Sequence, residues 1–163
     1  MMPIPIRIPL LLAATALAGC SHTPIGYSAS VAQGGIERVE TTRDGTSTAA
    51  TVDSYKADLA QRIHQVNSTQ VYTTRPQALL RSVVVLRYTV DSGGNLVRSE
   101  VARSNHDRDT EAVALTTLRK SAPFPKPAPH LLRNGRVEMV ESWLFNNDGR
   151  FQLRSLALAQ MDR

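Results

Sequence analysis

The chain has 163 residues, of which 42% are hydrophobic and 5% aromatic, and its formal net charge is +5 at pH 7. This length gives room for one modest domain and a tether. The basic residues are spread along the chain, with no run of five like charges and no interleaved aromatic ladder. The composition therefore argues against nucleic-acid binding, and the charge predicts only weak attraction to anionic surfaces.

The N-terminal residues predict export. Residues 8–18 form an apolar run that is too short to cross a membrane and has small residues beside it, as in a secretory signal. The tetrapeptide Leu17-Ala18-Gly19-Cys20 resembles a bacterial lipobox. The resemblance implies a signal peptide over 1–19, cleavage before Cys20, and lipid on its thiol and its new amino group. The alternative is an ordinary signal peptide that contains a cysteine.

The same region predicts the location of the protein. One cysteine excludes an intrachain disulfide, and lipidation removes the liability of a lone thiol in an oxidising compartment. Ser21 stands where an Asp in similar lipoproteins favours inner-membrane retention, so we expect anchoring in the inner leaflet of the outer membrane of a Gram-negative bacterium. Residues 20–52 are rich in small and polar residues without periodicity, which predicts a flexible periplasmic tether.

A folded domain is expected over 53–156, followed by a tail over 157–163. Its first element is a helix over 54–66, capped by Asp53 or Ser54. Four apolar residues recur there at helical spacing: Tyr55, Leu59, Ile63 and Val66.

A β-hairpin is expected next. Residues 82–90 and 96–103 are β-prone and flank the turn signal at 91–94. The side chains of the first strand alternate between two faces. One face is expected to carry Val84, Leu86, Tyr88 and Val90. The other, more exposed to solvent, is expected to carry Val83, Val85, Arg87 and Thr89.

The C-terminal half repeats this pattern. A second helix is expected to begin at Asp109 or Thr110 and to end before Pro123-Phe124-Pro125. Residues 136–145 alternate as a strand, but Glu141 interrupts one apolar set, so either face is a candidate for burial. A turn signal at 146–149 predicts a returning strand over 150–156. The expected fold class is α+β, with two layers: a small antiparallel sheet of three to four strands and two helices packed on one face.

The sequence offers no catalytic residue, metal site or cofactor motif. Four histidines lack metal-ligand spacing and are expected to be exposed: His22, His64, His106 and His130. Asp107 and Asp109 precede a helix, which favours capping over acid–base chemistry. Trp143 and Phe145 are expected in the core, with ligand stacking as the alternative. We therefore expect a protein that is not an enzyme.

Two segments resemble the C-terminal domain of TonB and the neighbouring TolA family. SVVVLRYTVDSGGNLVRSEVARSN (82–105) has the strand, acidic-glycine turn, strand and Ser-polar pair of that family. EAVALTTLRKSAPFPKP (111–127) has its small-residue helix closed by Pro-Phe-Pro. The two segments follow one another in the family's order, which makes the combination more specific than either segment alone.

The resemblance implies a non-enzymatic module that captures an extended segment of a partner as an added strand on the edge of 136–145. The expected binding residues are Val137, Met139, Val140, Trp143 and Phe145. Expected partners are envelope proteins, such as an outer-membrane receptor or a Tol- or Ton-type component, in transport or envelope integrity. The strand over 150–156 could cover this edge. The alternative function is binding of a small or polymeric envelope ligand, peptidoglycan or lipid, which a concave apolar cavity would favour.

Overall fold

The computed structural model describes residues 39–159, and the structural statements that follow concern these residues. The predicted signal peptide, the lipobox and Cys20 lie outside them. Among the described residues, no helix combines the length and the apolar character that crossing a membrane requires.

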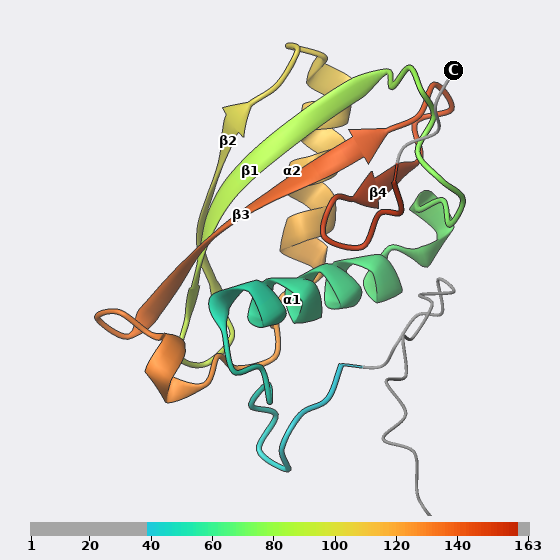
Figure 1. The fold of residues 1–163 in the computed structure, drawn as a ribbon. Helices are drawn as coiled ribbons and strands as arrows, with labels where there is room; N and C mark the ends of the chain where they lie inside the picture. The colour runs from blue at the N-terminus through green and yellow to red at the C-terminus, as the bar shows by residue number, and fades with distance from the viewer. Residues whose placement is uncertain (1–38, 160–163) are drawn as a thin grey trace, which may run out of the picture. The chain divides into compact units, whose positions relative to one another are not determined.

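The described residues form a two-layer α+β fold (Figure 1). Four strands make one antiparallel sheet in the order β2-β1-β3-β4, and the helices cover one face of it. This confirms the expected fold class. The elements in chain order are α1 (Val52–Val66), η1 (Ser68–Gln70), β1 (Ser82–Asp91), β2 (Leu96–Arg103), α2 (Arg108–Lys120), η2 (Pro129–Leu131), β3 (Arg136–Phe145) and β4 (Phe151–Leu153).

β1 lies between β2 and β3, and its two faces differ in burial. Its buried set is the predicted one, Val84, Leu86, Tyr88 and Val90, with exposed fractions of at most 1%. The opposite set is drier than expected, since Val83, Val85 and Thr89 are half-buried and only Arg87 is exposed. β3 buries Val137, Met139, Glu141, Trp143 and Phe145 on the helix side, which settles the face that the sequence left open.

Both helices begin earlier than the sequence predicted. Thr51, and not Asp53 or Ser54, is the N-cap of α1, and Ser54 is its reciprocal partner in a capping box. Asp107 is the N-cap of α2 and accepts from the amides of Asp109 and Thr110. The prediction of Asp109 or Thr110 as the helix start was wrong, whereas the prediction that this acidic pair serves capping is confirmed for Asp107.

Two further predictions need correction. His64 is buried, with 8% of its surface exposed, because it lies on the inner side of the last turn of α1. The last strand, expected over 150–156, comprises only Phe151–Leu153, because the chain then turns, with the Leu156 amide donating to the Leu153 carbonyl.

The two segments that carry the resemblance pack on each other. The Phe124 amide donates to the Gly94 carbonyl over 2.8 Å, and the Phe124 ring lies 6.3 Å from that of Tyr88. Gly94 has φ +84°, and a Cβ there would lie 2.2 Å from the Phe124 carbonyl oxygen. The glycine of the turn and the Pro-Phe-Pro segment thus form one junction, in which no larger residue fits at Gly94.

Part of the segment predicted as a tether lies against this domain. Ser47 donates its amide to the Lys126 carbonyl over 2.8 Å, and Lys126 donates to the Gly45 carbonyl over 2.9 Å. The Ser47 hydroxyl also donates to the carboxylate of Asp58 on α1. Ser47 is only 2% exposed, so this contact buries the residue against the domain. The extent of a flexible tether stays a prediction for the residues before this contact.

Candidate functional site

β3 has a neighbour along its whole length on one side but along only part of it on the other. It pairs with β1 from Phe145 to Arg136 without a break. On its other side it pairs with β4 only from Trp143 to Phe145. Figure 1 shows β4 beside the C-terminal part of β3 alone. The stretch 136–142 is therefore a sheet edge in the described structure.

Strand alternation identifies the backbone groups that face outward. In an antiparallel strand, the N–H and C=O of one residue point to one neighbour and those of the next residue point to the other. The Phe145 carbonyl accepts from Arg81, on the β1 side, whereas the Ser142 carbonyl accepts from Arg154, on the β4 side. The even-numbered residues of β3 therefore direct their backbone N–H and C=O groups outward, that is, within the sheet plane and away from β1.

Both ends of this edge are closed by local hydrogen bonds. At one end Arg136 exchanges two backbone hydrogen bonds with Arg133, over 2.8 and 3.1 Å. At the other end the Ser142 carbonyl accepts from the Arg154 amide over 3.0 Å, and the Ser142 amide donates to the Glu141 carboxylate over 2.7 Å. What stays open, among residues 39–159, is the outward N–H and C=O of Glu138 and of Val140. We call these four groups the β3 window.

The five predicted binding residues separate into two groups. Val137, Met139, Trp143 and Phe145 are at most 5% exposed and belong to the core against the helices. The Trp143 indole also donates to the Thr117 hydroxyl over 3.1 Å, which indicates a structural role. Val140 alone has an exposed side chain, at 43%, together with outward backbone groups. Their role in partner binding stays a prediction.

Sequence reasoning missed Glu138. It is exposed and contributes half of the β3 window. The alternation of 136–145 could have revealed it, because a residue two before Val140 must direct its backbone to the same side. The search for apolar binding residues passed over it, since its contribution comes from its main chain and not from its carboxylate.

The other sheet margins differ from the β3 window. Beyond β4, the Tyr72 amide donates to the Phe151 carbonyl over 3.1 Å, so that side is partly covered. β2 has no strand on its outer side in the described residues, but it carries Arg98, Glu100 and Arg103 along that edge strand. Charged residues on an edge strand discourage pairing with another chain. The β3 window carries one charged side chain, Glu138, against three on β2, and is the less protected of the two open margins.

Two tyrosines buried against the sheet have raised pKa values. Burial raises the pKa of the Tyr88 phenol well above its usual value, and the nearby Glu141 adds to the effect. Burial, with a smaller contribution from Asp148, raises the pKa of Tyr72 to about 12, and its hydroxyl donates to the Leu144 carbonyl. Both phenols stay neutral at physiological pH. No cluster of metal-ligating side chains occurs in the described part of the chain.

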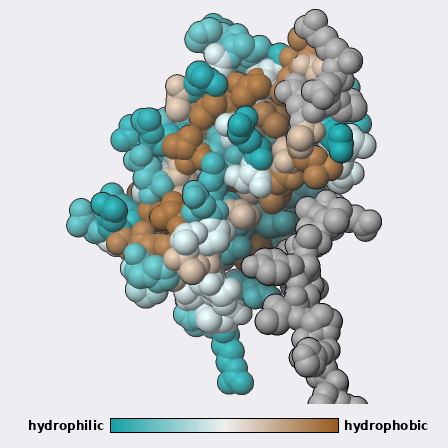
Figure 2. Space-filling model, in the orientation of Figure 1, coloured by the Kyte–Doolittle hydropathy of each residue, from teal (hydrophilic) through white to brown (hydrophobic). Residues whose placement is uncertain are grey.

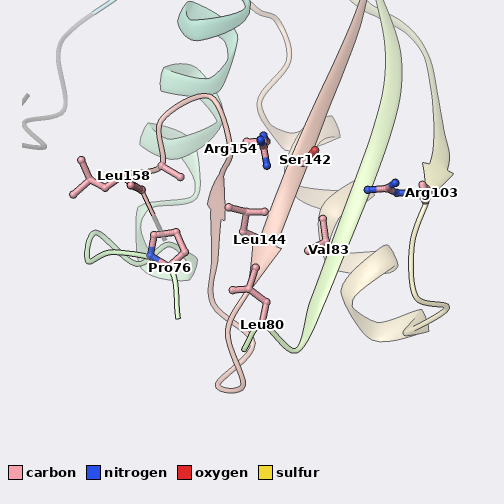
Figure 3. Close-up of a pocket in the computed structure, with 10 residues that line it drawn as sticks. Pro76, Leu80, Val83, Arg103, Ser142, Leu144, Arg154 and Leu158 are labelled. Atoms are coloured by element: carbon pink, nitrogen blue, oxygen red, sulfur yellow. The ribbon is translucent and has the colours of Figure 1, made fainter. Parts of the chain in front are cut away.

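The sheet face opposite the helices carries a second feature. Figure 2 shows hydrophobic side chains gathered on the face turned to the viewer, with hydrophilic residues between them. A cavity of about 790 Å³ lies on this outer face between the sheet and the segment that follows β4. Figure 3 shows its lining: Pro76, Leu80, Val83, Arg103, Ser142, Leu144, Arg154, Ala157, Leu158 and Ala159.

Comparison with known proteins supports the resemblance seen in the sequence. Among curated proteins, the chain is similar to the protein TonB of Pseudomonas putida, with 31% identity over 71 residues. This similarity supports a TonB-like domain. The match covers 44% of this chain and 29% of the length of that relative. No protein-family model matches the chain, and no solved structure matches it.

Proposed function

We propose that this chain is a lipid-anchored periplasmic docking module, which binds an extended segment of an envelope protein as an added strand on the β3 window. The observation that carries the proposal is the set of unpaired N–H and C=O groups of Glu138 and Val140 in an otherwise paired strand. Unpaired edge groups are a template for another strand. The similarity to TonB agrees with a non-enzymatic role.

The window defines a short binding register. Two donors and two acceptors on alternate residues allow up to four main-chain hydrogen bonds, and the bounded ends limit the added strand to roughly five residues. Side chains of the added strand that point to the outer face would contact Val140, which is 43% exposed. Those that point inward would lie beside Met139, which is already buried. Affinity would come from the backbone, and selectivity from the outer face.

The predicted lipid anchor would set where this docking occurs. Lipid on Cys20 and a flexible segment before the contact of Ser47 with the domain would hold the module near the inner leaflet of the outer membrane. A flexible segment of about 20 residues has a reach of roughly 25 Å. Partners within that layer, such as an outer-membrane receptor or a Tol- or Ton-type component, would meet the window at high local concentration.

Photo-crosslinking in cells tests the docking edge. A photoreactive residue is placed at Val140 in the full chain, and the matched control carries it at Val97 on β2, which is 46% exposed and so equally accessible. We expect a defined protein adduct from position 140 and none, or a different one, from position 97. The same adducts from both positions, or none from 140, would contradict edge docking.

A backbone substitution separates main-chain docking from side-chain contact. Val140→Pro removes the outward N–H without touching the ladder to β1, whereas Val140→Thr keeps the N–H and a β-branched shape. We expect a purified crosslinked partner to be captured by the Thr variant and not by the Pro variant. Unfolding curves of both proteins check that the Pro variant is folded. Equal capture by two folded variants would argue against strand addition.

The anchor has its own test, independent of the docking edge. Metabolic labelling with a palmitate analogue should mark the wild-type chain and leave Cys20→Ala unmarked, and fractionation should place the marked protein with the outer membrane. Absence of label, or label that persists in the variant, would refute lipidation at Cys20 and would leave the docking proposal standing.

A further inference from the structure

The cavity on the outer sheet face has two chemically distinct parts. Seven of its ten lining residues are apolar, namely Pro76, Leu80, Val83, Leu144, Ala157, Leu158 and Ala159, and none is aromatic. The remaining three are Ser142, Arg103 and Arg154. In Figure 3 both arginines lie at the same end as Ser142, while Leu80, Pro76 and Leu158 lie away from them. The cavity is thus basic at one end and aliphatic at the other.

The two arginines keep their charge available. Neither Arg103 nor Arg154 forms an ion pair with any residue of 39–159, a property they share with most arginines of this range. No acidic residue lines the cavity. Arg154 is held in place by its backbone, since its amide donates to the Ser142 carbonyl over 3.0 Å, and Arg103 is held opposite Val85 in the β1–β2 ladder. Guanidinium groups bind carboxylates through paired hydrogen bonds, so this end suits an anionic head group.

The other end suits a chain without polar atoms. Apart from the arginines, Ser142 supplies the sole polar side chain of the lining, so the side chains offer polar partners mainly at the basic end. An acyl chain carries no polar groups and gains from every contact with the aliphatic wall, by about 0.8 kcal/mol for each CH₂ removed from water. The volume of about 790 Å³ falls within the usual range for small-ligand sites.

We propose that this cavity binds a fatty acid, with its carboxylate between Arg103 and Arg154 and its acyl chain along Leu144, Leu80 and Leu158. The site lies on the outer face of the sheet, so its occupation does not depend on strand addition at the β3 window. Ser142 and Arg154 line the cavity, and their backbones also close one end of that window.

Calorimetric titration with sodium dodecanoate tests the proposal. The protein is the predicted mature chain, residues 20–163, carrying Cys20→Ser, so that neither the apolar signal sequence nor the predicted lipid requires a detergent. We expect saturable binding below the critical micelle concentration, and binding of dodecyltrimethylammonium at least about tenfold weaker because its head group repels both arginines. Absence of saturable binding, or equal binding of the two amphiphiles, would overturn the proposal.

Paired variants assign the site. Arg103→Gln with Arg154→Gln should weaken dodecanoate binding at least about tenfold. The control, Arg119→Gln with Arg133→Gln, removes the same charge from residues outside the cavity and should leave binding unchanged. Equal affinity of the two folded double variants would overturn the site.

A third variant and a second probe complete the test. Leu80→Asp changes only the apolar end and should weaken binding by a similar factor, and its thermal unfolding curve checks the fold. Retained affinity in a folded Leu80→Asp variant would overturn the assigned position of the acyl chain. Tighter binding of lauroyl lysophosphatidylglycerol than of dodecanoate would overturn the fatty-acid assignment and indicate a phospholipid ligand.

Discussion

The two parts of β3 have the same backbone conformation and different surroundings. From Trp143 to Phe145 the strand lies between β1 and β4, and its side chains are at most 8% exposed. At Glu138 and Val140 it has β1 on one side and no neighbour on the other in the described structure. The difference arises because β4 ends at Leu153 and the chain turns away. A strand can thus build the core over one half and offer a docking edge over the other.

The largest expected loss of stability comes from the part of β3 that lies between β1 and β4. Trp143→Ala removes a fully buried side chain and its hydrogen bond to Thr117, and should lower the free energy of unfolding by about 3–5 kcal/mol. Val140→Ala in the open part should cost about 0.5 kcal/mol, because its side chain is 43% exposed. Urea unfolding of both variants measures the contrast.

Trp143→Phe is the control for this pair. It keeps an aromatic ring in the core and loses the indole N–H, so its cost should fall between the two alanine variants, at about 1–2 kcal/mol. Similar costs for Trp143→Ala and Val140→Ala would mean that the two parts of β3 are equally covered in solution, and the distinction between core and edge would fail.

Two glycines in turns allow the same comparison between a tightly packed position and an open one. Gly94→Ala should cost about 3 kcal/mol, because φ is +84° and the new Cβ would lie 2.2 Å from the Phe124 carbonyl oxygen. Gly135, next to the open part of β3, has φ +73° and no atom within 4 Å of a new Cβ. Gly135→Ala should therefore cost only about 1 kcal/mol. Comparable thermal unfolding of the two variants would exclude the tight junction at Gly94.

Much of this fold was readable from the sequence, and the reasons are local. The alternation of apolar residues in 82–90 and the turn signal at Asp91–Gly94 predict a hairpin from local backbone geometry. The helical spacing of apolar residues from Tyr55 predicts which side of α1 is buried. The resemblance carried by 82–105 and 111–127 added the order of the elements. These features depend on neighbours within a few residues, which a sequence displays directly.

The rest depends on contacts between distant residues. The length of β4 is set by the turn after Leu153, and the burial of His64 by the packing of α1, so neither follows from a local pattern. The sequence could indicate 136–145 as an edge strand, but the extent of the β3 window is set by where pairing with β4 stops, which only the structure shows. The cavity brings together residues from 76 to 159, which no spacing rule connects.

His64, buried on α1, is expected to make the free energy of unfolding depend on pH. Burial lowers the pKa of its imidazole below the usual value of 6.5, so the unfolded chain binds the proton more readily than the folded one. The free energy of unfolding should therefore fall as the pH is lowered from about 7.5 to about 5.5. Urea midpoints at both values measure the slope, and His64→Leu should flatten it. Asp58 acts in the opposite sense, since burial raises the pKa of its carboxyl. An unchanged slope in His64→Leu would show that other groups cause the dependence.

The smallest effect is expected at Glu138, and it separates main-chain from side-chain docking. The Glu138 carboxylate lies 3.8 Å from Arg87 in an exposed ion pair, so Glu138→Ala should change the free energy of unfolding by less than about 0.5 kcal/mol. Its outward N–H and C=O remain in place, so capture of a crosslinked partner should also change little, whereas Val140→Pro should abolish it. A large loss of capture in Glu138→Ala would mean that the carboxylate contacts the partner directly, and the backbone of the open part would then no longer account for binding by itself.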